Sequence, residues 1–338
     1  MEGSAHISSI FERGPVDPDR FHDEVLGSEY PVVMRGQAAC WPAVQAARRS
    51  DEALVGYVQQ FDAGRPVEVL IGPPEIEGRF FYDEAMAGCN FQKRFGSLSS
   101  LLNKLLQLRT ADAPQSLYAG AAAAGTNLPG WSDANPFPFP VPEAVPRIWV
   151  GNQTHTNTHF DESANVAIVI GGRRRFTLFP PEQLDNLYLG PLHFTIAGPP
   201  VSMVDLRRPD LNRFPRFATA LENAVSAELG PGDAIFIPPL WWHNVEALDR
   251  LNVMMNYWWE TPLHHSGIAA LVHAVLSLRD LPPKHRAAWR HWFDRVVFDD
   301  DAAHAVDHLP PAVRGPLGPA STDRNTAILR QFAAGSGA

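Results

Sequence analysis

The stretch HTNTHFDESANVAIV, residues 155–169, decides the fold prediction because two polar side chains stand directly before a dense apolar run. The run is short and rich in β-branched residues, which predicts a buried strand. His159 and Asp161 lie two residues apart, and on an extended chain such residues point to the same side. Their imidazole and carboxylate groups, which are both metal ligands, can therefore converge on one point.

A second strand end supplies a candidate for a third ligand. His243 lies in IPPLWWHNVEAL, residues 237–248, after a proline turn and at the start of the next apolar strand. Two histidines and one carboxylate form the facial triad of non-heme Fe(II) oxygenases, which leaves coordination positions open. An isolated H-x-D pair is common by chance, but the PGD and WWH context downstream favours a metal site. Four other histidines are interpreted as loop, surface or helix-cap residues: His155, His193, His264 and His265.

Short strands separated by turns dominate the region around these residues. The apolar runs from residue 147 to residue 260 are RIWVGN, ANVAIVIGG, RRRFTLFP, AELGPGDAIFIPP, HNVEAL and LNVMMNYWW. The 31 prolines gather in the loops between such runs. This pattern predicts a sandwich or a barrel, interrupted by one helix in PRFATALENAVSAEL, residues 215–229.

The two ends of the chain differ from this centre. The first 110 residues mix expected strands (PVVMRG, PVEVLIG and GRFFYDE) with expected helices (DEALVGYVQQF and LSSLLNKLLQL). Beyond residue 262, apolar residues recur at helical spacing in two segments joined by RDLPPK. These helices either pack on the flank of the barrel or form the interface of a homodimer. The predicted domains are residues 1–110, 111–260 and 261–338. The apolar positions of the two helices are Ile268, Leu271, Val272, Val275, Leu276, Trp289, Trp292, Phe293, Val296 and Val297.

The amino-acid composition of the chain limits which classes of function are expected. The 338 residues include 28 Lys and Arg against 37 Asp and Glu, so the net charge of −9 disfavours a broad nucleic-acid-binding face. Cys40 and Cys89 are too few for a disulfide scaffold. We expect two free, buried thiols, although one disulfide stays open. No apolar segment typical of a signal peptide or a membrane span is visible, so a cytoplasmic protein is the default expectation.

Taken together, three segments resemble the cupin-like JmjC oxygenases, in particular the factor-inhibiting-HIF asparaginyl hydroxylase type and its bacterial relatives. The segments are THFDESANVAIVIGGRRRFTLFPPEQ, PGDAIFIPPLWWHNVEAL and NVMMNYWW. The resemblance extends over roughly residues 30–260 and is dense from about residue 147. It implies a mainly β fold with flanking helices, in which a double-stranded β-helix (a jelly-roll or cupin core) is followed by a C-terminal helical pair. It also implies Fe(II) held by His159, Asp161 and His243.

The resemblance further implies 2-oxoglutarate as cosubstrate, bound by side chains around the metal. These are Tyr118, Thr156, Asn165, Arg174 and Asn256. Arg174 stands thirteen residues after Asp161, where the asparaginyl hydroxylases have a lysine. A guanidinium can hold the distal carboxylate through two hydrogen bonds. The alternative is a surface charge within RRR, but strand alternation places Arg174 on the apolar side of Phe176 and Leu178.

The implied activity is that of an Fe(II)- and 2-oxoglutarate-dependent dioxygenase. It would use O₂ to hydroxylate a C–H bond of a protein or small-molecule substrate, with release of succinate and CO₂; nucleic acid is the less expected substrate. Two alternatives stay open: a cupin-type metalloenzyme that does not use 2-oxoglutarate, and a non-catalytic cupin-fold binding module. Four tryptophans are interpreted as packing residues, with a wall for substrate as the alternative. They are Trp241, Trp242, Trp258 and Trp259.

Overall fold

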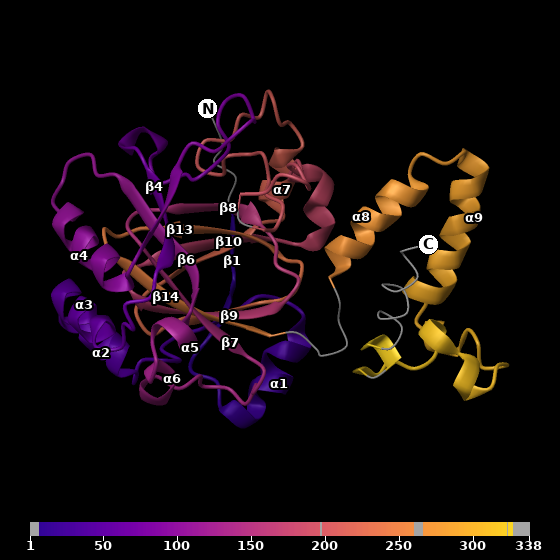
Figure 1. Ribbon diagram of the computed structural model, residues 1–338, viewed down its shortest axis with the longest axis horizontal. Coiled ribbons are helices and arrows are strands. Elements are labelled where there is room, and N and C mark those ends of the chain that lie inside the picture. The colour runs from indigo at the N-terminus through magenta and orange to yellow at the C-terminus, as the bar shows by residue number, and fades with distance from the viewer. Residues whose placement is uncertain (1–6, 197, 260–265, 323, 327–338) are drawn as a thin grey trace. The chain divides into compact units, whose positions relative to one another are not determined.

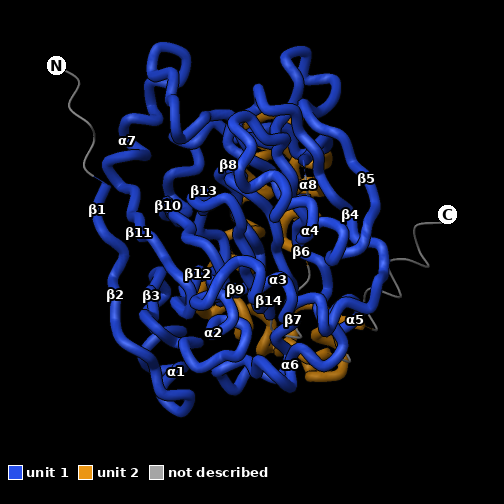
Figure 2. Tube along the Cα trace, turned by 90° about the vertical axis from the view of Figure 1, so that its left-hand side faces the viewer, with its two compact units in different colours: residues 1–259 blue, residues 260–338 orange. Residues whose placement is uncertain are grey.

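The computed structural model describes residues 7–196, 198–259, 266–322 and 324–326. The chain divides into two compact units, residues 1–259 and residues 260–338 (Figure 2). The first unit is built on two β-sheets with helices around them, and the described part of the second is helical (Figure 1). The mainly β cupin fold with flanking helices is therefore confirmed. Among the described residues, no helix combines the length and apolar character needed to cross a membrane.

The strands from β8 to β14 are distributed over two sheets, as in a double-stranded β-helix. The smaller sheet has the order β1 (Ser8–Ser9), β11 (Val225–Leu229), β10 (Arg174–Phe179), β13 (Trp242–Ala247) and β8 (His155–His159). The larger has the order β2 (Phe11–Arg13), β3 (Val32–Met34), β12 (Ala234–Ile237), β9 (Ala164–Gly171), β14 (Asn252–Trp259), β7 (Val145–Gly151), β6 (Ser116–Ala123), β4 (Val67–Gly72) and β5 (Gln92–Gly96). From β8 to β14 the chain crosses repeatedly between them, so residues distant in sequence face one another.

The larger sheet is buried on both faces at β9, which explains the unbroken apolar run of this strand. Ala167 and Val169 pack between the sheets, in a cluster with side chains of the smaller sheet such as Phe176. Val166 and Ile168 pack in the opposite cluster, with the helices. A strand covered on both faces reads as a continuous apolar stretch rather than an alternating one.

Helices from the first 110 residues cover the outer face of the larger sheet. They are α2 (Pro42–Arg49), α3 (Asp51–Gln59) and α4 (Leu98–Leu108). The side chain of Ser50 caps α3 and that of Ser97 caps α4, which satisfies backbone donors at the two helix starts. Shorter helices are α1 (Phe21–Glu24), α5 (Ala124–Asn127), α6 (Trp131–Ala134) and α7 (Phe217–Glu222). The first 110 residues also supply strands β2 to β5, so they are continuous with the larger sheet.

Three local predictions are wrong. GRFFYDE forms only isolated bridges, between Arg79 and His155 and between Tyr82 and Cys89. The helix expected over residues 215–229 ends at Glu222, because the chain then pairs with β10 as β11. The thiols are free as expected, but neither is buried: Cys40 is exposed and Cys89 is partly exposed.

The second unit contains the two helices that the apolar spacing predicts. They are α8 (Gly267–Leu278) and α9 (Pro283–Phe293), and a π-helical turn over Asp294–Phe298 extends α9. Ser266 caps the start of α8 through the backbone N–H of Ala269. The large apolar side chains exposed in this unit are Leu271, Leu276, Trp289, Trp292, Val297, Phe298 and Val313. The predictions for His264 and His265 lie outside the described residues.

Candidate metal centre

His159 and His243 face each other across neighbouring strands at one end of the barrel. They are directly paired in the antiparallel ladder of β8 and β13, and their ring centroids are 4.2 Å apart. Asp161 follows β8, and its Oδ2 is 3.6 Å from Nε2 of His243. One ligand atom from each of the three residues lies within 4.8 Å of the others. Side chains remote in sequence therefore meet around one point that a single ion can occupy.

The hydrogen bonds of both imidazoles leave the same nitrogen available to an ion. Nδ1 of His159 donates to the carbonyl of Asn157 at 2.8 Å, and Nδ1 of His243 donates to that of Trp241 at 3.0 Å. Because a carbonyl only accepts, each Nδ1 carries a proton, so Nε2 is the nitrogen that each ring can offer to an ion. Burial lowers the pKa of His243, and the neighbouring His159 lowers it further, against the opposing effect of Asp161. Two imidazoles and one carboxylate suit Fe(II).

A bulge in β8 brings Thr156 to the same side as His159. The two residues are three positions apart, which would place them on opposite faces of a regular strand. Their partners on β13, Val245 and His243, are only two positions apart, and the register shifts between them. The extra residue in β8 lets both Thr156 and His159 line the pocket.

Arg174 lies deeper in the barrel, and no ion pair to its guanidinium is found in the part of the chain that the structure describes. Its side chain is 2% exposed, and Nε and Nη2 have no hydrogen-bond partner among the described residues. On β10 it lies four residues from Leu178, which pairs with His243. That separation corresponds to roughly 13 Å along the strand. Burial lowers the pKa of Arg174, and a buried cation is costly without an anion. The space between Arg174 and the metal ligands therefore suits a carboxylate.

Two hydroxyl groups accompany Arg174. Tyr118 is buried, and burial raises the pKa of its phenol, although Arg174 and a hydrogen bond with Thr156 oppose the shift. The phenol is therefore protonated and can donate to an anion. Tyr118 and Thr156 both line the pocket that Arg174 lines. One guanidinium and two hydroxyls form a donor set that complements a carboxylate.

The two predicted asparagines form the wall on the larger sheet. Nδ2 of Asn256 donates to Oδ1 of Asn165 at 3.3 Å, and Nε1 of Trp149 donates to Oδ1 of Asn256. All eight residues predicted for the site line this one pocket. The pocket also includes Trp149, Ala167, Phe176, Ile237, Val245, Met254 and Trp258. Sequence reasoning missed Trp149, although its alternation with the buried Ile148 and Val150 is a usable signal.

His155 does not lie in a polar loop, and that interpretation is wrong. It begins β8, is 2% exposed, and pairs its Nε2 with Oδ1 of Asn244 at 2.9 Å. Burial lowers the pKa of His155, and Arg207 lowers it further. His155 stands outside the cluster formed by the three candidate ligands. His193 is exposed, as expected.

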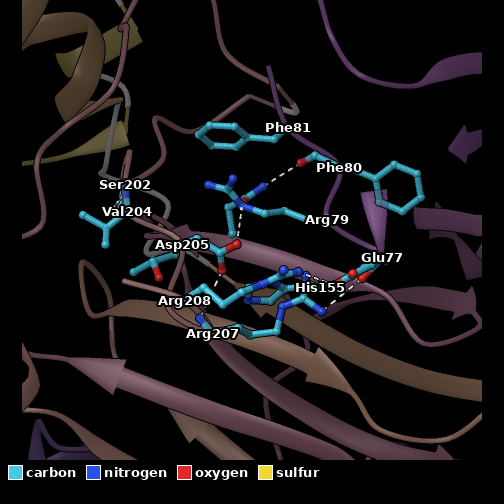
Figure 3. A network of polar contacts seen from close by, with 12 residues as sticks. Glu77, Arg79, Phe80, Phe81, His155, Ser202, Val204, Asp205, Arg207 and Arg208 are labelled. Carbon is cyan, nitrogen blue, oxygen red and sulfur yellow. Dashed lines mark hydrogen bonds and ion pairs between the residues drawn. The ribbon is translucent and has the colours of Figure 1, made fainter. Parts of the chain in front are cut away.

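A polar network covers the outer face of β8 (Figure 3). Nε of Arg79 donates to Oδ1 of Asn157 at 3.2 Å and lies 3.7 Å from Oδ2 of Asp205. Arg207 donates to the carbonyl of Glu77 at 3.0 Å. These contacts attach two remote segments of the chain to the back of the strand that carries His159. Sequence reasoning did not predict this network, because its members are scattered in loops.

Comparison with known proteins places the chain among related sequences. A family model described as cupin-like domain matches residues 18–265. HSPB1-associated protein 1 of Homo sapiens is 33% identical over 186 residues, which cover 52% of this chain and 36% of that protein. Lysine-specific demethylase 8 of Xenopus tropicalis is 26% identical over 242 residues, covering 71% and 50%. tRNA wybutosine-synthesizing protein 5 of Danio rerio is 31% identical over 146 residues, covering 38% and 42%. The chain thus spans half or less of the length of each relative.

Proposed function

The chain belongs to the cupin-like domain family of JmjC-type oxygenases, and from this premise we propose that it is an Fe(II)- and 2-oxoglutarate-dependent oxygenase. Its reaction would hydroxylate a C–H bond of a protein or small-molecule substrate and release succinate and CO₂. The observation that carries the proposal is the buried guanidinium of Arg174, whose Nε and Nη2 have no partner among the described residues, in the same pocket as His159, Asp161 and His243. Three metal-binding side chains alone fit many cupins, whereas a buried cation beside them calls for an anionic cosubstrate.

Each group of side chains has a distinct part in this proposal. His159, Asp161 and His243 would hold Fe(II), and three protein ligands leave positions for the cosubstrate and O₂. Bound Fe(II) and 2-oxoglutarate would supply the oxidising chemistry, while the protein orients the groups and excludes water. Arg174 and the hydroxyls of Tyr118 and Thr156 would hold the distal carboxylate of 2-oxoglutarate. The apolar lining keeps competing water from the centre; it consists of Ala167, Phe176, Ile237, Val245 and Met254.

The direct test measures succinate formed from 2-oxoglutarate by the purified chain with added Fe(II) and O₂. We expect turnover that is lost in His159→Ala and Asp161→Ala and kept in the exposed-site control His193→Ala. Metal binding without any stabilisation by 2-oxoglutarate would favour a cupin metalloenzyme of another type. Binding of both ligands without succinate in the presence of candidate substrates would favour a non-catalytic binding module.

Three wider features belong to the same proposal. The net charge of −9 makes a protein or small molecule a better-suited substrate than nucleic acid. We place the protein in the cytoplasm. We also propose a homodimer through α8 and α9, because Trp292 of α9 is 61% exposed and Leu276 of α8 is 77% exposed.

A further inference from the structure

Two buried N–H donors lie at the end of the pocket wall that the larger sheet forms. They belong neither to the metal ligands nor to the groups that would hold 2-oxoglutarate. Nε of Arg147 and Nε1 of Trp258 are inaccessible to solvent and have no hydrogen-bond partner among the described residues. Buried donors are almost always paired, so an orphaned donor needs an explanation. Two of them on adjacent strands, beside a candidate active site, point to an acceptor that the protein itself does not supply.

The register of the strands places both donors on the inner face of the barrel. Trp258 lies two residues after Asn256 on β14 and lines the pocket with it. Arg147 lies two residues before the pocket residue Trp149 on β7, so it shares that face. Arg147 is also the direct cross-strand partner of Asn256. The guanidinium carbon of Arg147 lies 5.6 Å from the centroid of the Trp258 ring.

These two side chains lie at the same end of the barrel as the metal ligands. Trp258 pairs with Asn165, near the start of β9, and only residues 160–163 separate β9 from His159 at the end of β8. His159 and Trp258 are both partly exposed, whereas Arg174 at the other end is buried. The pocket is therefore accessible from this end, and a substrate reaching the metal passes Trp258, which lines the pocket and has Arg147 beside its ring.

Contacts within the wall hold the ring of Trp149 and the Nη1 end of Arg147. The rings of Trp149 and Trp258 meet edge to face, with centroids 5.7 Å apart. Trp149 is fixed by its hydrogen bond to Asn256, and Nη1 of Arg147 donates to the carbonyl of Ala121 at 3.0 Å. No carboxylate of the described residues lies within ion-pair distance of Arg147. A neutral carbonyl thus positions the positive charge of Arg147, which has no counter-ion within the described ranges.

We propose that Arg147 and Trp258 form a substrate subsite for a carboxylate. The preferred substrates would then carry an acidic group next to the carbon that is oxidised. This inference rests on the proposed oxygenase function and adds the substrate chemistry to it. Both N–H groups are covered in the ligand-free protein, so binding requires the two side chains to turn towards the pocket. Nε of Arg147 and Nε1 of Trp258 then donate to the carboxylate oxygens, and the indole face of Trp258 packs on the adjoining apolar part. The carboxylate can belong either to the side chain of an acidic peptide or to a free small-molecule acid.

Binding is measured without turnover, from tryptophan fluorescence, because two indoles stand in the wall. The protein is loaded with Mn(II) and saturating 2-oxoglutarate, so that Arg174 is already occupied. One probe set consists of short peptides that differ only in carrying Glu, Gln or Lys beside a varied central residue. The other consists of small carboxylic acids and their amides. The two sets distinguish a peptide from a free acid as the source.

We expect the carboxylate form of the better set to bind roughly 10- to 100-fold more tightly than its amide form. Arg147→Gln removes that preference, and Arg147→Glu shifts it towards the Lys peptides. Arg94→Gln, an exposed substitution on β5, leaves the preference unchanged. Thermal unfolding of each variant, with and without 2-oxoglutarate, reports that the fold and the cosubstrate site persist.

Equal affinity for carboxylate and amide probes, no binding of any carboxylate probe, or a preference that survives Arg147→Gln would each overturn the subsite. These outcomes do not depend on succinate formation. A protein that binds acidic probes through Arg147 but never consumes 2-oxoglutarate would contradict the oxygenase and leave the subsite standing.

Discussion

His159 and His243 lie opposite each other on β8 and β13, and each donates Nδ1–H to the carbonyl of the residue two positions before it. The orientation and the tautomer of both rings are therefore fixed by the backbone before an ion binds. A preformed pair of this kind loses little conformational freedom on metal binding. Asp161 then completes the set from the loop that follows β8.

Removal of one imidazole should abolish the metal site and leave the sheet intact. For His243→Ala we expect the affinity for Mn(II) to fall by about 100-fold or more, a larger loss than outer-shell changes cause. Titration calorimetry with Mn(II) measures the change, and His193→Ala serves as the exposed control. A wild-type affinity in His243→Ala would remove this residue from the ligand set.

Arg174→Leu should separate stability from cosubstrate binding. Replacing an unpaired buried cation by an apolar side chain is expected to stabilise the ligand-free protein by about 1–4 kcal/mol. The same variant should lose the thermal stabilisation by 2-oxoglutarate and raise its KM by roughly tenfold or more. Arg175→Gln is the matched control, because Arg175 lies next on β10, is exposed, and pairs with Glu228 and Glu246. An unchanged KM in Arg174→Leu would contradict the anchoring role.

The pH dependence of stability should report the burial of His155. Burial and the charges of Arg207 and Arg79 hold the pKa of His155 below its ordinary value of 6.5, against Asp205 and Asn244. The unfolded chain therefore gains a proton before the folded chain does, so stability falls as the pH drops below 6.5.

His155→Gln should reduce this loss by about 1 kcal/mol between about pH 7.5 and about pH 5.5. Urea unfolding at the two pH values gives the difference, and the comparison cancels any cost of the substitution that is independent of pH. His193→Gln, at an exposed position, should keep the wild-type dependence. Identical slopes in His155→Gln and wild type would show that this residue is not the sensor.

The exposed aromatic residues of α9 should govern the oligomeric state. Trp289 and Trp292 are 46% and 61% exposed, which is typical of side chains that a partner covers. We expect light scattering to give a dimer for the wild type and a monomer for Trp292→Glu. Phe95→Glu removes another exposed aromatic ring, on β5, and should leave the mass unchanged. A monomeric mass for the wild-type protein would contradict the proposed dimer.

Sequence alone predicts the site where the chain is regular. His159 and Asp161 follow the simple alternation of an extended chain, and Arg174 follows from its apolar neighbours Phe176 and Leu178. Thr156 does not, because only the bulge in β8 turns it inward, and no local pattern announces a bulge. For Thr156 the resemblance to a family was needed.

Tertiary competition explains the other differences. Residues 223–229 continue a helical pattern, yet pairing with β10 makes most of them a strand. His155 looks solvated among polar neighbours, but segments near Arg79 and Asp205 cover it. Arg147 escaped notice because a single arginine in an apolar run has no distinctive sequence signal. Its position becomes informative only when β14 and β6 are placed beside it.

The outer edge of β8 is already hydrogen-bonded, and this restricts how a peptide could bind beside it. β8 is the last strand of its sheet, but its first residue, His155, donates N–H to the carbonyl of Gly78, and Ser202 donates to the carbonyl of Thr158. A peptide cannot extend this sheet by adding a strand beside the metal ligands. If the substrate is a peptide, as one form of the proposed function has it, its selection would depend on side chains that enter the barrel from its open end rather than on strand pairing.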